Sequence, residues 1–377
     1  ELVARPIQEE YPMYNQKKIY FDAFEQTSLA GGDRYPEATE EINRSVFKGS
    51  LSMVYLGHGG PTGWAQERVL KVEDINSWSN TDHYPILVTA TCSFTGFDDP
   101  AQTTAGEFSL LNPNGGMVGL LSTVRLVFST DNFRLTKAVH DRMFEKPFGQ
   151  RPYLGEILKE AKNGNPADTL YANSRKFFLF GDPATPLAIP QQFVYTSKIN
   201  GVDANQQTDT LRAMETVTIE GYVGNENGDL LNDFNGTLYA TIYDKAIELK
   251  TLSNDPSSFE RKFKLQTNIL FKGKVTVENG EFSLQFVMPK DINYQYGNGK
   301  ISFYAADTSR LVDAGGFFTD IIIGGTDPDA PVDEIGPLVE VFMNDTLFRD
   351  GGITGRNPVL LARISDDNGI NLSLIHI

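Results

Sequence analysis

One cysteine and one histidine stand at matching places behind two apolar segments of this chain. Cys92, the only cysteine, directly follows the run 86–91, and His58 follows the run 51–56 after one glycine. The thiolate is the nucleophilic form of cysteine, and an imidazole beside it can accept the thiol proton. The pair therefore indicates a nucleophile that attacks a carbonyl group, with the histidine as base toward the thiol and acid toward the leaving amine.

Each of these residues alone has a simpler explanation. Lone cysteines are often buried and inert, and a histidine among glycines can have a purely structural role in a turn. The spacing favours a joint role, because 34 residues (92 − 58) are about one strand–helix–strand crossover. Functional groups of an open parallel sheet gather at the carboxyl ends of its strands. We therefore predict that His58 and Cys92 lie together at one sheet edge.

The elements that must position the pair form an α/β pattern. The runs 51–56, 86–91 and 117–121 are almost continuously apolar, as expected for strands covered on both faces. Helical periodicity and a Thr104/Glu107 capping box place helices between them. The predicted helices cover 36–48, 72–78, 104–111, 132–144 and 153–162, and further strands cover 18–21 and 176–180. We predict a mostly parallel sheet with helices on both faces for residues 1–190.

Glycines surround the histidine on both sides. Gly57, Gly59 and Gly60 let the backbone bend sharply and approach a substrate closely. Two backbone N–H groups aimed at one point can stabilise the oxyanion that forms when a thiolate attacks a carbonyl. We expect the N–H groups of Gly59 and Cys92 to form this oxyanion hole.

The pattern changes to short alternating strands after about residue 190. Runs at 216–223, 236–243, 273–277, 281–287 and 299–305 predict an antiparallel, immunoglobulin-like β-sandwich over 191–325. Asn279-Gly280 between two of these runs predicts a hairpin. A linker follows at 326–336, and residues 337–377 read as the start of a further, truncated β domain. We expect the first domain to be truncated at its N-terminal side as well.

Composition excludes several classes of protein. The net charge of −16 over 377 residues leaves no basic face for nucleic acid. A single cysteine forms no internal disulfide, which fits a reducing cytoplasm or a disulfide-free exported protein. No cysteine or histidine cluster has the spacing of zinc ligands. We therefore expect no cofactor; a structural calcium ion at Asp98-Asp99 is an alternative that no ligand set assigns, and a turn with solvated carboxylates explains those residues equally well.

A family resemblance rests on longer motifs around this pair. A strand ending in His-Gly, followed one crossover later by a strand ending in Cys, resembles the caspase-like cysteine peptidases. The motifs GHGGPTGWA (57–65), ATCSF (90–94), LNPNGG (111–116) and LFGDP (179–183) are similar to the gingipain family, and within it to the sortases of the type IX secretion system. VTIEGY (217–222) and GGIT (351–354) extend the resemblance into the β region. It covers nearly the whole chain except its last few residues.

The resemblance implies a thiol peptidase or transpeptidase at the bacterial cell surface, associated with the outer membrane. Such an enzyme removes the C-terminal signal domain of exported proteins and passes the acyl group, through a thioester, to an amine on anionic lipopolysaccharide. Its partners would be exported proteins with that domain, the lipopolysaccharide, and outer-membrane secretion components such as PorV. Only His58 and Cys92 carry over from the family as catalytic residues.

Three residues are weaker candidates. Trp64 could form the wall of a substrate pocket or pack beneath the histidine loop. Arg125 follows the strand 117–121 and could meet a carbonyl or carboxylate of the substrate, although a structural hydrogen bond is the commoner role. Asp22 could orient His58, or serve as a loop or capping residue.

Two questions about function stay open at this stage. A catalytically inactive surface scaffold or adhesion module is the alternative to an enzyme, although the intact pair argues against it. The sequence also does not separate hydrolysis from transfer.

Overall fold

The computed structural model describes the whole chain except residues 146–148, 165–172, 207–209, 331–335 and 367–377. The chain divides into two compact units. The first unit comprises Glu1–Ile189 together with Glu248–Leu265, and the second unit comprises Pro190–Ile247 and Gln266–Ile377. Residues 248–265, which the sequence placed inside the β-sandwich, thus belong to the first unit.

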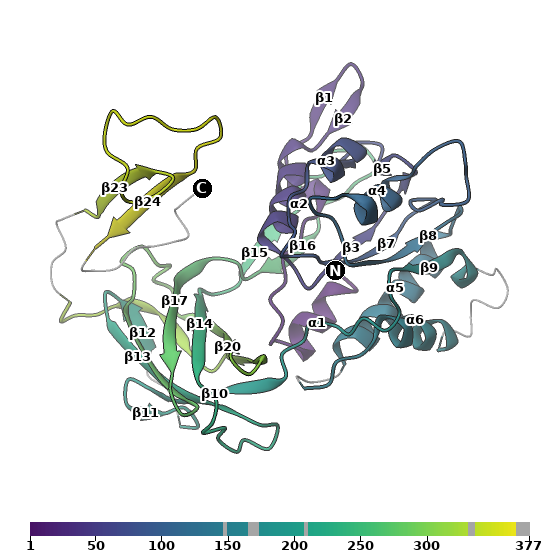
Figure 1. Cartoon of the computed structure of the whole chain (residues 1–377). Coiled ribbons are helices and arrows are strands. Elements are labelled where there is room, and N and C mark those ends of the chain that lie inside the picture. Colours follow the sequence, from purple (N-terminus) through teal and green to yellow (C-terminus); the bar gives the residue numbers. More distant parts are fainter. Residues whose placement is uncertain (146–148, 165–172, 207–209, 331–335, 367–377) are drawn as a thin grey trace. The chain divides into compact units, whose positions relative to one another are not determined.

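A four-stranded sheet forms the centre of the first unit (Figure 1). Its order is β3 (Ser52–Leu56), β7 (Ile86–Ala90), β8 (Gly119–Thr123) and β9 (Phe177–Phe180). The first three strands are parallel and β9 is antiparallel to β8. The sheet is therefore mostly parallel, as the apolar runs predict.

Burial differs between the central and the edge strands of this sheet. Every residue of β7 and β8 is buried. In β3, at one edge, the side chains of Val54 and Leu56 are 38% and 41% exposed. The prediction of cover on both faces is therefore wrong for β3, because only the face that carries Met53 and Tyr55 packs into the core.

Helices lie on both faces of the sheet. The helices of the first unit are α1 (Ala4–Glu10), α2 (Pro36–Lys48), α3 (Val72–Ser77), α4 (Ala105–Leu111), α5 (Ser129–Phe144) and α6 (Leu154–Asn163). Buried side chains of α2, α3 and α4 share one core cluster with Leu87 and Leu120 of the sheet. Helix α5 packs against α6 and contacts β7, and Figure 1 shows both helices on the side of the sheet opposite α3 and α4.

Local signals explain where these helices start and stop. Ala38, Ile42 and Val46, at helical spacing, form the buried stripe of α2. This helix starts with Pro36 in its first turn and ends at Gly49, whose φ is 84°. The capping box of α4 forms as predicted: the Thr104 backbone N–H donates to the Glu107 carboxylate at 2.8 Å.

Shorter elements fill the rest of the first unit. They are the 3-10 turns η1 (Phe21–Ala23) and η3 (Ser174–Lys176), and the strands β1 (Thr27–Leu29), β2 (Gly32–Arg34), β4 (Gly59–Gly60), β5 (Gly63–Trp64), β6 (Leu70–Lys71), β15 (Ile247–Lys250) and β16 (Lys262–Leu265). The strand predicted at 18–21 is wrong. Lys18 and Tyr20 instead bind the Glu1 carboxylate through their side chains, at 3.1 and 2.8 Å.

The second unit is built on β-strands. One connected sheet has the order β17-β14-β20-β21-β10-β13-β18, with β11 paired to β10, and a second has the order β12-β22-β19. The strands are β10 (Gln192–Ile199), β11 (Val202–Asp203), β12 (Thr210–Ala213), β13 (Thr216–Gly224), β14 (Gly236–Tyr243), β17 (Ile269–Val277), β18 (Glu281–Val287), β19 (Gly297–Asn298), β20 (Lys300–Asp307), β21 (Val312–Phe318) and β22 (Ile322–Thr326). Their alternating apolar residues meet in one core.

The predicted hairpin at Asn279-Gly280 is half right. These residues have φ of 53° and 81°, and the bridge Glu278–Glu281 closes a tight turn. The flanking strands do not form a ladder with each other, since β17 pairs with β14 and β18 pairs with β13. The turn therefore connects the two ends of the sheet order.

A separate hairpin of β23 (Leu338–Met343) and β24 (Leu360–Ser365) lies in the region where the sequence predicts a further β domain. No helix in the described part of the chain is long and apolar enough to span a membrane.

Burial of His140 in α5 predicts a pH dependence of folding. The ring is buried, and its Nδ1 lies 2.9 Å from the Thr136 carbonyl, to which it donates. Burial holds the imidazole pKa below its ordinary value, so the unfolded chain binds this proton more tightly. Stability should therefore fall as the pH drops below about 6.5, by up to about 1.4 kcal/mol per pH unit.

Denaturant titrations between pH 5 and 8 test this. His140→Gln, which keeps a donor for Thr136 but does not titrate, should flatten the slope, whereas His83→Gln on the surface should leave it unchanged. Equal slopes for the two variants would contradict the assignment.

Candidate active site

The register of β3 and β7 brings His58 and Cys92 to the same level of one sheet edge. Leu56 lies opposite Ala90 in this parallel pair. Each reactive residue lies two positions further along (58 − 56 = 2 and 92 − 90 = 2), so both leave the carboxyl edge together. His58 is exposed and Cys92 is partly exposed, so a substrate can reach both.

Cys92 sits in a turn that is tied to the segment after β8. Ser93 adopts φ +49°, and its N–H donates to the Arg125 carbonyl at 3.2 Å. The Cys92 Sγ lies 3.8 Å from the Val127 carbonyl oxygen. The backbone next to Cys92 is therefore fixed to β8 and the segment that follows it.

The chain after His58 folds back at once as a small hairpin. Gly59 pairs with Trp64, and the Ala65 N–H donates to the His58 carbonyl at 2.8 Å. A Cβ on Gly59 would lie 2.7 Å from the Thr91 hydroxyl oxygen. Gly59 therefore touches the residue that precedes Cys92, and only glycine allows this approach. The oxyanion hole of Gly59 and Cys92 stays a prediction.

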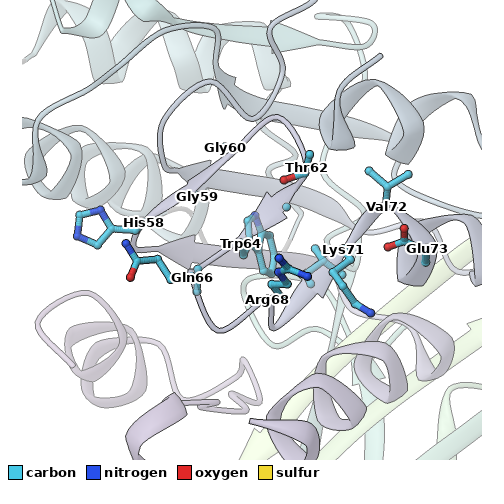
Figure 2. A pocket seen from close by; sticks show the side chains of 13 residues that line it. His58, Gly59, Gly60, Thr62, Trp64, Gln66, Arg68, Lys71, Val72 and Glu73 are labelled. Atoms are coloured by element: carbon cyan, nitrogen blue, oxygen red, sulfur yellow. The ribbon is translucent and has the colours of Figure 1, made fainter. Parts of the chain in front are cut away.

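Trp64 packs beneath the histidine loop. Its side chain is 3% exposed and stacks on Tyr55, with ring centroids 4.3 Å apart and planes 10° from parallel. The packing alternative therefore describes most of this residue. Its edge still forms part of a pocket of 570 Å³ (Figure 2).

This pocket opens on the histidine side of the site. Its polar and charged lining residues are His58, Thr62, Gln66, Arg68, Lys71 and Glu73, and Cys92 does not line it. Arg68, Lys71 and Glu73 line this space beside the histidine, and no ion pair of the two cations is found in the described part of the chain.

Arg125 forms an exposed ion pair with Asp98. Its guanidinium binds both carboxylate oxygens of Asp98, one of them at 2.7 Å. This contact holds the pKa of the Asp98 carboxyl below its usual value. The structural role is thus observed for Arg125, and substrate binding by this residue stays a prediction. In the described residues no group of three or more His, Cys, Asp or Glu could hold a metal ion.

Asp22 does not orient His58 either. Its carboxylate accepts hydrogen bonds from the backbone N–H groups of Asn254, at 2.8 Å, and Ser253, at 3.2 Å. Asp22 thus caps the turn between β15 and β16, which was the alternative role. Among the described residues, no carboxylate is hydrogen-bonded to the His58 ring, so the sequence and the structure leave this histidine without an assigned acidic partner.

One residue of the site, Tyr55, was not predicted from the sequence; its side chain forms a hydrogen bond with the His58 carbonyl. Tyr55 lies three positions earlier on β3, and its hydroxyl donates to that carbonyl at 2.6 Å. A tyrosine near the end of a strand, two residues before a glycine, is the only sequence signal, and it is too common to single out the residue.

Comparisons with known proteins found one family and several solved structures that resemble this chain. The model of peptidase family C25 matches residues 1–188. Among solved structures, dimeric latent PorU from Porphyromonas gingivalis is 25% identical at a TM-score of 0.40, covering 84% of this chain and 28% of that one. A complex of Porphyromonas gingivalis RgpB pro- and mature domains is 13% identical at a TM-score of 0.36, covering 76% of this chain and 57% of that one.

The Arg-specific cysteine proteinase gingipain R (RgpB) is 14% identical at a TM-score of 0.36, covering 76% of this chain and 56% of that one. The chain thus spans less than a third of the PorU chain and just over half of the RgpB chains. A search of curated proteins gave no match. The match of the family model over 1–188, the part that carries His58 and Cys92, shows that the chain belongs to peptidase family C25, the gingipain family of cysteine peptidases.

Proposed function

We propose that this chain is a cysteine endopeptidase and transpeptidase that acts as a sortase of the type IX secretion system. It would cleave the C-terminal signal domain from exported proteins and attach them to cell-surface lipopolysaccharide. The observation that carries the proposal is the parallel register of β3 and β7, which sets His58 and Cys92 at one sheet edge in a C25 peptidase. Its place would be the outer surface of the outer membrane, beside secretion components such as PorV.

The first half of the reaction is acylation. His58 takes the Cys92 thiol proton, and the thiolate attacks the carbonyl carbon of the scissile peptide bond. The N–H groups of Gly59 and Cys92 hold the oxyanion of the tetrahedral intermediate. His58 then returns the proton to the leaving amine, so the C–N bond breaks and the signal domain departs. A thioester to Cys92 remains.

The second half decides between hydrolysis and transfer. The acceptor attacks the thioester carbonyl and loses a proton to His58; the C–S bond then breaks and His58 returns the proton to the Cys92 sulfur. Because His58 also served the first leaving amine, the acceptor is expected on the same side. We place the acceptor in the pocket beside His58, which carries Arg68 and Lys71. Cations at this position favour an amine that belongs to an anionic molecule, as lipopolysaccharide does. This observation supports transfer over hydrolysis.

Removal of the thiol tests the enzyme against the scaffold. In cells that express the full-length protein with Cys92→Ala, exported proteins should keep their C-terminal signal domain, because no thioester can form. The fold should survive, since in the described part of the chain the Cys92 side chain forms a single hydrogen bond, a weak one of 3.8 Å to the Val127 carbonyl. If a folded Cys92→Ala protein still supports normal processing, the chain is not the enzyme, and the alternative of an inactive surface scaffold is favoured.

The pocket cations test the acceptor. Arg68→Ala with Lys71→Ala should lower transfer to an anionic amine about tenfold or more while hydrolysis continues, because one or two ion pairs to the acceptor are lost. Mass analysis of the new C-terminus separates a free carboxylate from an added amine. Lys48→Ala, an exposed lysine of α2 outside this pocket, is the matched control. An unchanged ratio of the two products in the double variant would reject the pocket as the acceptor site.

A further inference from the structure

The His58 carbonyl is held by two donors from different elements. The Tyr55 hydroxyl donates to it at 2.6 Å and the Ala65 N–H at 2.8 Å. Tyr55 is 6% exposed, and burial raises its pKa, so the hydroxyl keeps the proton that it donates. Both lone pairs of this carbonyl are thus used, and the backbone of His58 is fixed relative to β3 and to the hairpin that follows.

Gly57 lies so close to the Tyr55 hydroxyl that a side chain at this position would disturb the hydrogen bond. A Cβ at this position would lie 2.5 Å from the Tyr55 hydroxyl oxygen, well inside van der Waals contact. A side chain at 57 would therefore displace the hydroxyl from the His58 carbonyl. Close approach to Tyr55 gives a physical reason for a glycine directly before the histidine.

The Tyr55 ring belongs to a row of aromatic rings that joins both halves of the site. It stacks on Trp64 at 4.3 Å and lies 6.0 Å from Phe21. Trp64 lies 5.9 Å from Phe94, which is two residues after Cys92. The row therefore connects the strand before His58, the hairpin after it and the loop of Cys92.

The far end of this row is anchored by the β15–β16 hairpin. Asp22, next to Phe21, accepts from Ser253 and Asn254 through its carboxylate, and its carbonyl accepts from the Leu252 N–H at 2.6 Å. The Asn254 side chain also donates to the Phe24 carbonyl at 2.9 Å. A segment that follows the start of the second unit in sequence thus fixes the position of Phe21 in the first unit.

We propose that Tyr55 is the positioning residue of His58, and that the β15–β16 hairpin supports it through Asp22 and Phe21. This rests on the proposed function, because it assigns how the base of that site is held. Tyr55 touches no reacting atom. It fixes the backbone from which the imidazole reaches the thiol, and misplacement of a catalytic group slows the chemical step more than substrate binding.

Steady-state cleavage of a peptide that spans the junction of a signal domain tests this. Tyr55→Phe keeps the ring stack and removes only the hydroxyl, so kcat should fall about tenfold while KM stays within about twofold. The matched control is Tyr195→Phe in the second unit, where the tyrosine hydroxyl also donates to a backbone carbonyl, that of Asn225, at 2.8 Å. The control should behave as wild type.

A double-mutant cycle tests the geometry. Gly57→Ala should lower kcat strongly in wild type and by a smaller factor in Tyr55→Phe, because the approach to the hydroxyl oxygen at 2.5 Å is removed and only that to the ring carbon Cζ, at 2.8 Å, remains. Asp22→Asn tests the support from the hairpin, and its effect should also shrink in the Tyr55→Phe background. If, in both cycles, the fold-change in kcat of the double variant equals the product of the two single fold-changes, the proposal is overturned.

The alkylation rate of Cys92 by iodoacetamide separates this inference from the function on which it rests. If Cys92 of the wild type is alkylated rapidly, and both His58→Ala and Tyr55→Phe lower that rate, the positioning role and the proposed function are both supported. Reactive Cys92 with an unchanged rate in Tyr55→Phe overturns the positioning role alone. A Cys92 that reacts like an ordinary thiol and ignores His58→Ala overturns the positioning role together with the proposed function.

Discussion

Everything at the candidate site depends on the parallel pairing of β3 with β7. In a strand the side chains alternate between faces, so a slip of one residue would move every side chain of β3 to the wrong side. The register that sets Leu56 opposite Ala90 is also the one that sets His58 level with Cys92. The alternation in β3, where Tyr55 is buried between the exposed Val54 and Leu56, specifies that register. The chemistry thus follows from the same apolar contacts that build the core.

The second constraint is how closely the two loops approach each other. Gly59 touches Thr91, and Gly57 touches Tyr55, at distances that no other residue type could keep. The loops are short and glycine-rich, so their positions are set by what lies beneath them, which is the aromatic row from Phe21 to Phe94. The β15–β16 hairpin holds the outer end of that row. A peptidase unit cut at residue 190 would therefore lack a part of its own support.

Local signals in the sequence were sufficient for most of the first unit. Pro36 and Gly49 predict where the helix 36–48 begins and ends, and Thr104 and Glu107 predict the capping box of α4. These signals are legible in the sequence because they act over three or four residues. The pair at 58 and 92 was predictable because apolar runs fix strand ends. Contacts distant in sequence were not: Asp22 with Asn254, Arg125 with Asp98, and the pairing of β17 and β18 with strands other than each other. Each is decided by which surfaces meet after folding, and no local period encodes that.

The central claim is that the edge residues act as one nucleophile and base, and detection of the acyl-enzyme tests it most directly. The full-length protein would be mixed with an exported protein that carries its signal domain, quenched in acid and measured by intact mass and peptide mapping. We expect the mass of the acyl fragment as a thioester on Cys92, reduced in His58→Ala and lost in Cys92→Ala. An acyl group on any other residue, or substrate turnover by the Cys92→Ala protein, would contradict the account.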